Sequence, residues 1–242
     1  MNDPFLETPK ELDPSFDAWK GSAEDYACHS DAAGIGEYDG RTLWIGIGGG
    51  EYEQKGLALA SKARLRCLCI DGKNIPQQMI DAAGEIQGLE RLQLGNIGPR
   101  SLTPLQSLAN LKSLYLEGIK GQQQWSVHDL SDLKSVLVSG DTEAISSLLR
   151  EGNPNVRYLA LGGTASANLK LADLSFLGGF PGMEHLVLFN VTVSSRSLDP
   201  CLLLPRLQNV IVNFARQWER QSVETLKAKG VSVRCRMDEM RS

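Results

Sequence analysis

The chain has 242 residues, of which 42% are hydrophobic and 22% are charged. This composition supports a folded core and excludes wholesale disorder, because disordered chains combine few apolar residues with a high net charge. The formal charge of −4 is unevenly distributed. Residues 1–40 hold ten acidic residues and two lysines, so the rest of the chain carries 23 of the 25 basic and 19 of the 29 acidic residues. This small positive excess is scattered, which excludes a nucleic-acid interface, since that needs a concentrated basic face.

The five cysteines are irregularly spaced, which predicts free thiols rather than the even set of a small disulfide framework. The first residues, MNDPFLETPKELDP, have acids and prolines where a signal peptide needs a basic start and an apolar run. No stretch approaches the roughly 18 consecutive apolar residues of a membrane span. We therefore expect a cytoplasmic protein that does not contact membranes.

A six-residue pattern, Leu-x-x-Leu-x-Leu, recurs along the chain, with Val, Ile or Met replacing some of the leucines. The copies begin at Thr42 (a loose match), Leu65, Leu89, Leu111, Leu133, Val156, Met183 and Leu207. The steps between them are 23, 24, 22, 22, 23, 27 and 24 residues. A period of this size is typical of a solenoid, in which each repeat is one small structural unit.

The pattern resembles that of the leucine-rich-repeat family, and in particular short internalin-like repeats, over about residues 42–235. The resemblance implies an α/β fold: a right-handed solenoid with a concave parallel sheet and short helices or turns on the convex side. One position departs from the family, because the asparagine usual three residues after the last leucine is mostly absent. Lys73, Ile97, Ile119 and Asp141 are examples of what replaces it, so we expect a less regular turn there.

The residue pattern predicts the same arrangement. Positions four and six of each copy share one face of a strand, and positions three, five and seven share the other. The first face is apolar in every copy, so it points into the coil. A single repeat cannot bury this face alone, so neighbouring repeats must stack into one continuous core.

The connecting segments predict a few further elements. Residues 101–108 resemble a brief helical turn, and residues 142–150 predict a helix with Asp141 as its N-cap and Gly152 after its end. Residues 220–229 predict a last helix, followed by an edge strand at 231–233. We expect residues 1–41 to form an acidic N-terminal cap or arm, and residues 42–242 to form the solenoid.

Two features suggest chemistry, and neither completes a site. The loop Gly46-Ile-Gly-Gly-Gly50 follows a strand, but its spacing is not that of a dinucleotide fingerprint, and the acidic residues after it would repel a pyrophosphate. Cys67 and Cys69 lie on one side of a strand, but a metal site would need two more ligands and the chain has three histidines. No nucleophile has a base at a recognisable spacing. We expect no cofactor, no metal and no enzyme activity; the alternative is an enzyme or cofactor-binding protein that uses this loop and these cysteines.

The outward strand positions change character along the chain. They are polar in the N-terminal half, with Arg91, Gln93 and Glu117, and apolar in the C-terminal half. The apolar strip consists of Leu137, Tyr158, Ala160, Val187, Phe189 and Ile211. A solvated sheet face does not need this many apolar residues, so the strip indicates an interaction site. Two alternatives stay open: a loop or the N-terminal arm covers the strip, or β-propensity alone selected Val187 and Ile211.

Family resemblance implies a protein ligand, so the sequence predicts a monomeric, non-enzymatic protein-binding module, acting as an adaptor or as an inhibitor of one specific protein. The residues expected to bind the ligand are Arg91, Tyr115, Glu117, Leu137, Tyr158, His185, Phe189 and Ile211. Among these, we expect the aromatic residues and His185 to act as anchors, and Arg91 and Glu117 to provide charge complementarity. We also expect Tyr158 and Phe189 to be exposed, so that truncating them would affect stability little.

Overall fold

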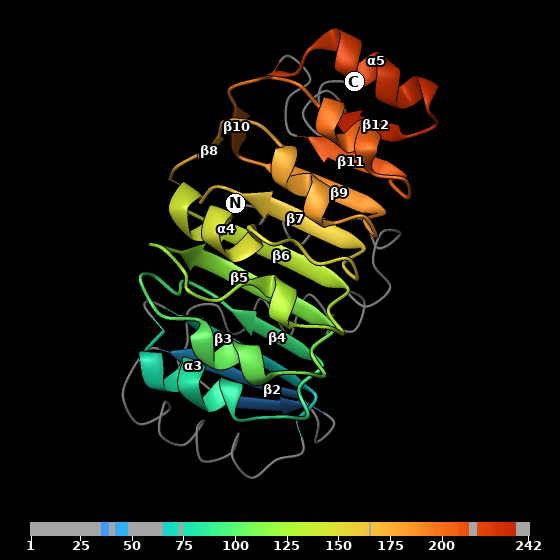
Figure 1. The fold of residues 1–242 in the computed structure, drawn as a ribbon. Coiled ribbons are helices and arrows are strands. Elements are labelled where there is room, and N and C mark those ends of the chain that lie inside the picture. The colour runs from blue at the N-terminus through green and yellow to red at the C-terminus, as the bar shows by residue number, and fades with distance from the viewer. Residues whose placement is uncertain are drawn as a thin grey trace.

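The computed structural model describes residues 35–38, 42–47, 65–72, 75–164, 166–212 and 217–235. Ten of its strands stack one after another into a single curved sheet (Figure 1). Their bounds are β1 (Ile35–Tyr38), β2 (Thr42–Ile47), β3 (Cys67–Gly72), β4 (Arg91–Leu94), β5 (Ser113–Ile119), β6 (Ser135–Gly140), β7 (Tyr158–Gly162), β9 (His185–Phe189), β11 (Asn209–Val212) and β12 (Ser232–Cys235). Only β1 pairs antiparallel, with β2; all other neighbours in this sheet are parallel.

The strand register matches the sequence repeat. Leu92 pairs with Leu114, and Leu114 pairs with Val136, so position four of each copy lies beside position four of the next. The parallel sheet, the register and the connecting helices confirm the expected α/β leucine-rich-repeat solenoid. Of the residues expected to form an N-terminal cap or arm, the structure describes β1, which adds an antiparallel strand beyond the first repeat.

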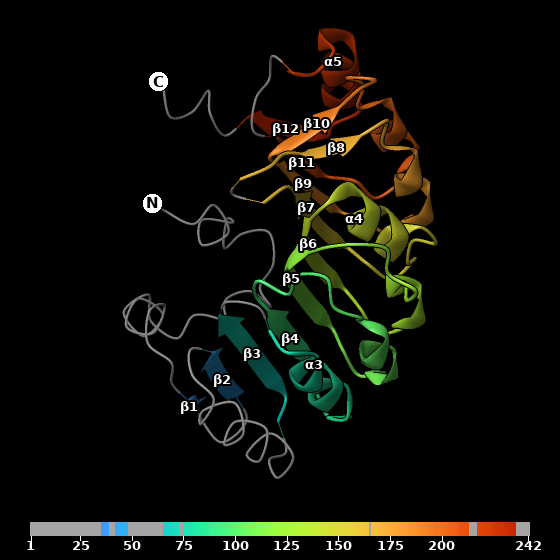
Figure 2. The same ribbon diagram turned by 90° about the vertical axis from the view of Figure 1, so that its left-hand side faces the viewer.

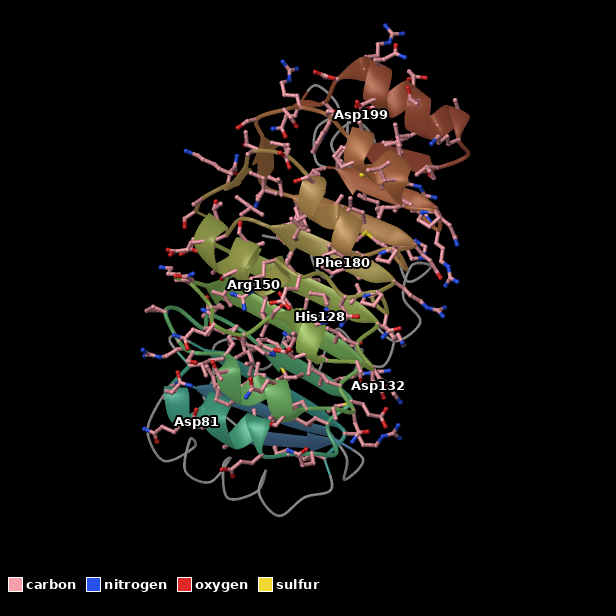
Figure 3. All side chains as sticks on the ribbon, in the orientation of Figure 1. Asp81, His128, Asp132, Arg150, Phe180 and Asp199 are labelled. Carbon is pink, nitrogen blue, oxygen red and sulfur yellow. The ribbon has the colours of Figure 1, made fainter. Side chains whose placement is uncertain are left out.

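The helical segments lie on the convex side of the sheet, opposite its concave face (Figure 2). Among the described residues, three of these segments are α-helices and four are 3₁₀ turns, which shorten the return path of the coils. Their bounds are α3 (Gln77–Gly84), η2 (Thr103–Ser107), η3 (Val127–Asp129), α4 (Thr142–Leu149), η4 (Ser175–Gly179), η5 (Asp199–Leu203) and α5 (Arg220–Ala228). The convex surface is charged and exposed at Asp81, Asp132, Arg150 and Asp199, as Figure 3 shows.

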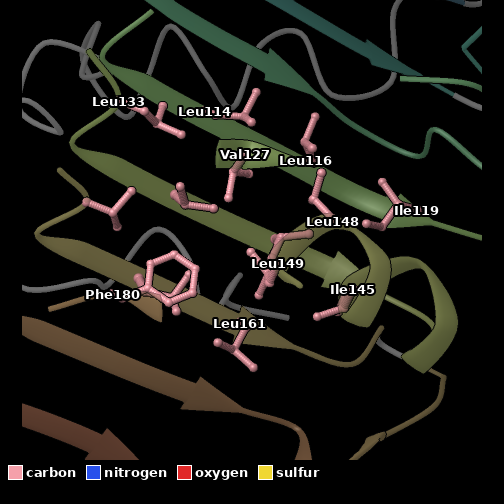
Figure 4. Packing of buried hydrophobic residues seen from close by; sticks show 14 of the residues in the cluster. Leu114, Leu116, Ile119, Val127, Leu133, Ile145, Leu148, Leu149, Leu161 and Phe180 are labelled. Atoms are coloured by element: carbon pink, nitrogen blue, oxygen red, sulfur yellow. The ribbon is translucent and has the colours of Figure 1, made fainter. Parts of the chain in front are cut away.

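One continuous hydrophobic core runs between the sheet and the convex segments, from Leu65 to Val231. In the middle of the solenoid, Leu114 and Leu116 of β5 point toward Val127, Leu148 and Leu149 from the convex side (Figure 4). Burying a leucine side chain contributes roughly 1.5–3 kcal/mol, so each inward position stabilises the stack of coils.

The turn after each strand differs from the usual asparagine turn, as the missing asparagines suggested. In three repeats a residue with positive φ reverses the chain, and the next, apolar residue turns back into the core. These pairs are Asn96 before Ile97, Gly118 before Ile119, and Asn190 before Val191. Backbone bonds then hold the coils together, for example the Ile97 amide donating to the Glu117 carbonyl at 3.0 Å.

Asparagines do connect successive coils, but on the other side of the strand. Asn110 and Asn155, each directly before a repeat, donate from Nδ2 to the Gln87 and Ser131 carbonyls of the preceding coil, at 2.9 and 2.8 Å. Asn153 is buried and donates to two carbonyls of the coil before it, both at 2.8 Å. These bonds tie the backbone oxygens of one coil to a side chain of the next.

Several predicted elements are confirmed. The helix expected at residues 142–150 is α4, and the Asp141 carboxylate accepts a hydrogen bond from the Ala144 amide at 2.8 Å, as an N-cap does. The brief turn, the last helix and the edge strand correspond to η2, α5 and β12. The sequence reasoning missed α3, and it missed β8 (Leu169–Leu171) and β10 (Val191–Val193), which pair with each other. β8 lies within the longest, 27-residue step, and β10 lies in the next repeat.

We predict that Leu114→Ala lowers the free energy of unfolding by roughly 2–5 kcal/mol, because Leu114 is only 2% exposed and truncation leaves a cavity. Urea denaturation followed by circular dichroism measures the change. The control is Leu203→Ala, since Leu203 is 77% exposed on the convex side and its truncation should shift stability by about 0.5 kcal/mol or less. Equal midpoints for the two variants would contradict the inward assignment of position four.

Candidate functional site

The outward positions of neighbouring strands stand side by side and form rows across the concave face. The central row, position five of each repeat, pairs Tyr115, Leu137, Ala160, Val187 and Ile211 in succession. Neighbouring strands lie about 4.8 Å apart, so this row extends over roughly 19 Å. The register therefore brings together side chains that are up to 96 residues apart in the sequence.

Four outward side chains form a hydrophobic cluster of their own, separate from the core on the other side of the sheet. They are Leu137, Tyr158, Ala160 and Phe189, with Tyr115 and Val187 packed at the margin. We call these six residues the concave cluster. The Phe189 ring lies directly against Gly162 of the neighbouring strand, where a Cβ atom would collide with it. Glycine at this position of β7 thus makes room for the ring.

The expectation that Tyr158 and Phe189 are exposed is wrong. Tyr158 is 2% exposed and Phe189 is 5% exposed, and every residue of β6 and β7 is buried. The described helices do not explain this burial, since they lie on the opposite side of the sheet (Figure 2). Periodicity shows which way a side chain points, but it does not show whether the face it points from is covered.

Polar groups border the concave cluster. The Tyr115 hydroxyl donates to the Glu117 carboxylate at 3.3 Å, and the Asn209 amide nitrogen lies 3.0 Å from Nδ1 of His185. Ser135 and Ser139 are buried on β6, within the face. The site thus has an apolar centre and a polar margin, which is the arrangement of protein interfaces.

The eight residues expected to bind a ligand divide into two groups. The structure brings Tyr115, Glu117, Leu137, Tyr158 and Phe189 together, with His185 at the margin. Arg91 on β4 and Ile211 on β11 lie on the same face but outside the concave cluster.

Sequence reasoning placed Asn209 and Gly162 among the outward positions but assigned neither of them a role. Both follow from the register, because Asn209 stands opposite His185, and Gly162 stands opposite Phe189. The alignment of the copies gives these neighbours, but it does not show the His185–Asn209 contact or the close approach of the Phe189 ring to Gly162.

Charged residues line the edge where the strands begin. Glu90 accepts hydrogen bonds from Arg66 at 2.8 Å and from Lys112 at 3.2 Å. Partial burial raises the pKa of Glu90, but these hydrogen bonds and the two positive charges outweigh it and hold the pKa below its ordinary value. The ion pairs therefore stabilise the fold fully when the pH is above the ordinary pKa of a glutamate. This contribution is lost as the pH falls through the lowered pKa of Glu90. Arg157 forms a similar pair with Glu184 at 3.6 Å.

Two other pKa shifts lie on the convex side, in the connecting segments. Burial, together with the charge of Asp199, raises the pKa of the Cys201 thiol to about 12, so this cysteine is not a nucleophile at neutral pH. Hydrogen bonds from Ser175 lower the pKa of the exposed Asp173. Neither group faces the concave cluster.

The residues considered for cofactor or metal chemistry are only partly described. Residues 48–50 of the glycine loop lie outside the described residues, and Gly46 pairs with Asp71 between β2 and β3. Cys67 and Cys69 lie on the concave face, on β3. Within the described ranges, no three His, Cys, Asp or Glu side chains lie close enough to hold a metal ion. The described helices are also too short and too polar to span a membrane.

Two solved structures, both from Listeria monocytogenes, are similar to this chain. Internalin C2 is 20% identical, with 70% of this chain and 59% of that chain covered, at a TM-score of 0.37. The internalin inlF is 14% identical, with 80% of this chain and 66% of that chain covered, at a TM-score of 0.44. The chain thus spans less than two thirds of either structure. No protein-family model matches the sequence, and no curated protein matches it.

The fold assignment itself rests on the parallel register and on the buried inward positions described above.

We predict that Phe189→Ala lowers the free energy of unfolding by about 3 kcal/mol or more, as expected for truncation of a buried phenylalanine. Lys134→Ala, at an exposed position where β6 begins, is the control and should change stability by about 0.5 kcal/mol or less. Urea denaturation of both variants measures the difference. A Phe189 variant as stable as the control would mean that the concave face is open to solvent.

Proposed function

We propose that this chain is a non-enzymatic protein-binding module whose ligand lies along the concave face. The observation that supports the proposal is the concave cluster. The inward positions already close the core of the solenoid, so a second apolar cluster on the opposite face is not needed to stack the repeats. Aromatic side chains that are buried at the centre of a contact and surrounded by polar groups are typical of protein interfaces.

The site favours a ligand segment that presents apolar side chains to its centre and polar groups to its margin. Tyr158 and Phe189 lie on strands that are direct neighbours, so one short segment of a ligand can contact both. Glu117 and the pair of His185 and Asn209 offer hydrogen-bonding groups on either side. Arg91 and Ile211 would extend the contact along the face.

An adaptor and an inhibitor of one protein would use the same surface, and they differ only in whether the bound ligand loses its activity. We propose a reducing compartment, the cytoplasm, for this function, which the odd number and irregular spacing of the five cysteines support. We further propose that the binding unit is a monomer.

Affinity capture with the full chain, followed by mass spectrometry, tests the proposal. The binding variant combines Tyr115→Ala with Val187→Ser, because both residues are only half-buried at the margin of the concave cluster and their loss leaves the core intact. Leu203→Ser on the convex side is the matched control. Proteins captured by the native chain and by the control, but not by the binding variant, are ligands of the concave face.

The leading ligand is then purified and titrated against all three proteins. We expect the binding variant to weaken the affinity at least 30-fold, which corresponds to about 2 kcal/mol for the combined loss of the two side chains. Circular dichroism verifies that the variant is folded. Equal affinities for the native chain and the binding variant, or a loss confined to Leu203→Ser, would move the interface away from the concave face and refute the proposal.

A further inference from the structure

We infer that residues 1–34 of the chain itself cover the concave cluster, so that an external ligand must displace them. This inference rests on the proposed function, since it identifies what competes for the same site. It makes the acidic N-terminal region an intramolecular occupant that regulates binding.

The first observation is the extent of the burial. An outward side chain on an open sheet keeps much of its surface in water, yet Leu137, Tyr158 and Ala160 are buried as deeply as core residues. The burial is local, because Arg234, which occupies the same row on the last strand, is exposed. Tyr115 and Val187, on the strands either side of the centre, are half-buried. The covered area is therefore centred on β6 and β7 and reaches β5 and β9.

The second observation is the length of chain available to cover this area. Residues 1–34 precede β1, which lies six strand spacings, or about 29 Å, from β7. Thirty-four residues span up to about 110 Å when extended, so they reach the whole area with length to spare.

The other stretches outside the described residues are less suited to this role. Residues 236–242 would need their full extended length of about 24 Å to pass from β12 to β5. Residues 48–64 must bring the chain from the end of β2 back to the start of β3. The remaining stretches contain four residues or fewer.

The third observation is chemical complementarity. Residues 1–34 hold eight acidic residues against two lysines, and they also carry the apolar rings of Phe5, Phe16 and Trp19. A basic residue directly precedes each of the three neighbouring strands under the covered area. These residues are Lys112 before β5, Lys134 before β6 and Arg157 before β7. Backbone hydrogen bonds of 2.8 Å join these three residues in a ladder. With Arg66, Glu90 and Glu184 included, this edge holds four basic and two acidic residues, so it keeps a positive excess beside the apolar cluster. The segment offers rings together with negative charge. Glu117 and His185 also border the cluster, and Glu90 and Glu184 lie at the same edge, where they pair with Lys112 and Arg157.

Covering the site from within the chain has a consequence for affinity. A tethered segment acts at an effective concentration of roughly millimolar, so even weak contacts keep it in place. An external ligand then binds with its intrinsic affinity reduced by the fraction of molecules in which the face is open. Weakening the segment should therefore strengthen ligand binding without changing the ligand site.

Hydroxyl-radical footprinting of the full chain, read out residue by residue by mass spectrometry, tests the inference. The variant combines Phe5→Ser, Phe16→Ser and Trp19→Ser. We expect the oxidation rates of Tyr158 and Phe189 to rise several-fold in this variant. Phe180 is the internal control, because it is fully buried in the core on the other side of the sheet, and its rate should stay unchanged.

A second variant, Lys134→Glu with Arg157→Glu, tests the same contact by changing the basic edge of the sheet instead of residues 1–34. Both residues are exposed and lie outside the core, so their reversal should leave the fold intact while it repels the acidic segment. We expect it to raise the oxidation of Tyr158 and Phe189, again without a change at Phe180. If the first variant also raises the oxidation of Phe180, it has unfolded, and the second variant then decides.

Two outcomes would overturn the inference. If the oxidation rates of Tyr158 and Phe189 are already high in the native chain and equal to those in the variants, the face is open. Protection of both residues in all three proteins would show that something other than residues 1–34 covers them. The proposed function fails separately: a variant with an uncovered face that captures no ligand refutes binding and leaves the inference standing. Conversely, a native chain with an open face that captures a ligand refutes the inference and leaves the proposed function standing.

Discussion

The stacking of inward apolar side chains between consecutive coils is the interaction on which this structure depends. Leu92, Leu114, Val136 and Leu159 stand in one row across four parallel strands, and each is buried by the coils on either side. No coil can bury this row alone, so the strands must keep a common register. The 3₁₀ turns, the positive-φ turns after the strands and the asparagines between coils all serve to maintain that register.

A common register also determines what the opposite face can do. It aligns positions three, five and seven of every repeat into rows, so residues on separate coils form one surface. In this chain the rows hold the concave cluster, which borders polar groups on its own face and basic residues where β5, β6 and β7 begin. One sheet thus has a core on one side and an apolar cluster with a charged edge on the other. This second cluster is the physical basis of the proposed binding function and of its proposed control by residues 1–34.

The sequence was sufficient for the architecture, because repeat position alone decides which side chains point inward. It also located α4 and its Asp141 cap, since the cap is a local signal. It did not predict the burial of Tyr158 and Phe189, because periodicity contains no information about what lies over a sheet face. It missed α3, whose N-terminus begins after Pro76 without a side-chain cap, and it missed β8 and β10, which pair only through tertiary contact.

The most direct test of a filled concave face is methyl nuclear Overhauser spectroscopy on the full chain, with labelled Leu137 and Val187. We expect contacts from these methyl groups to the rings of Tyr158 and Phe189, and further contacts to aromatic protons of residues 1–34. The first set tests the concave cluster, and the second set tests its occupant. Methyl groups that contact only the neighbouring strands and water would contradict the claim that the concave face is a filled binding site.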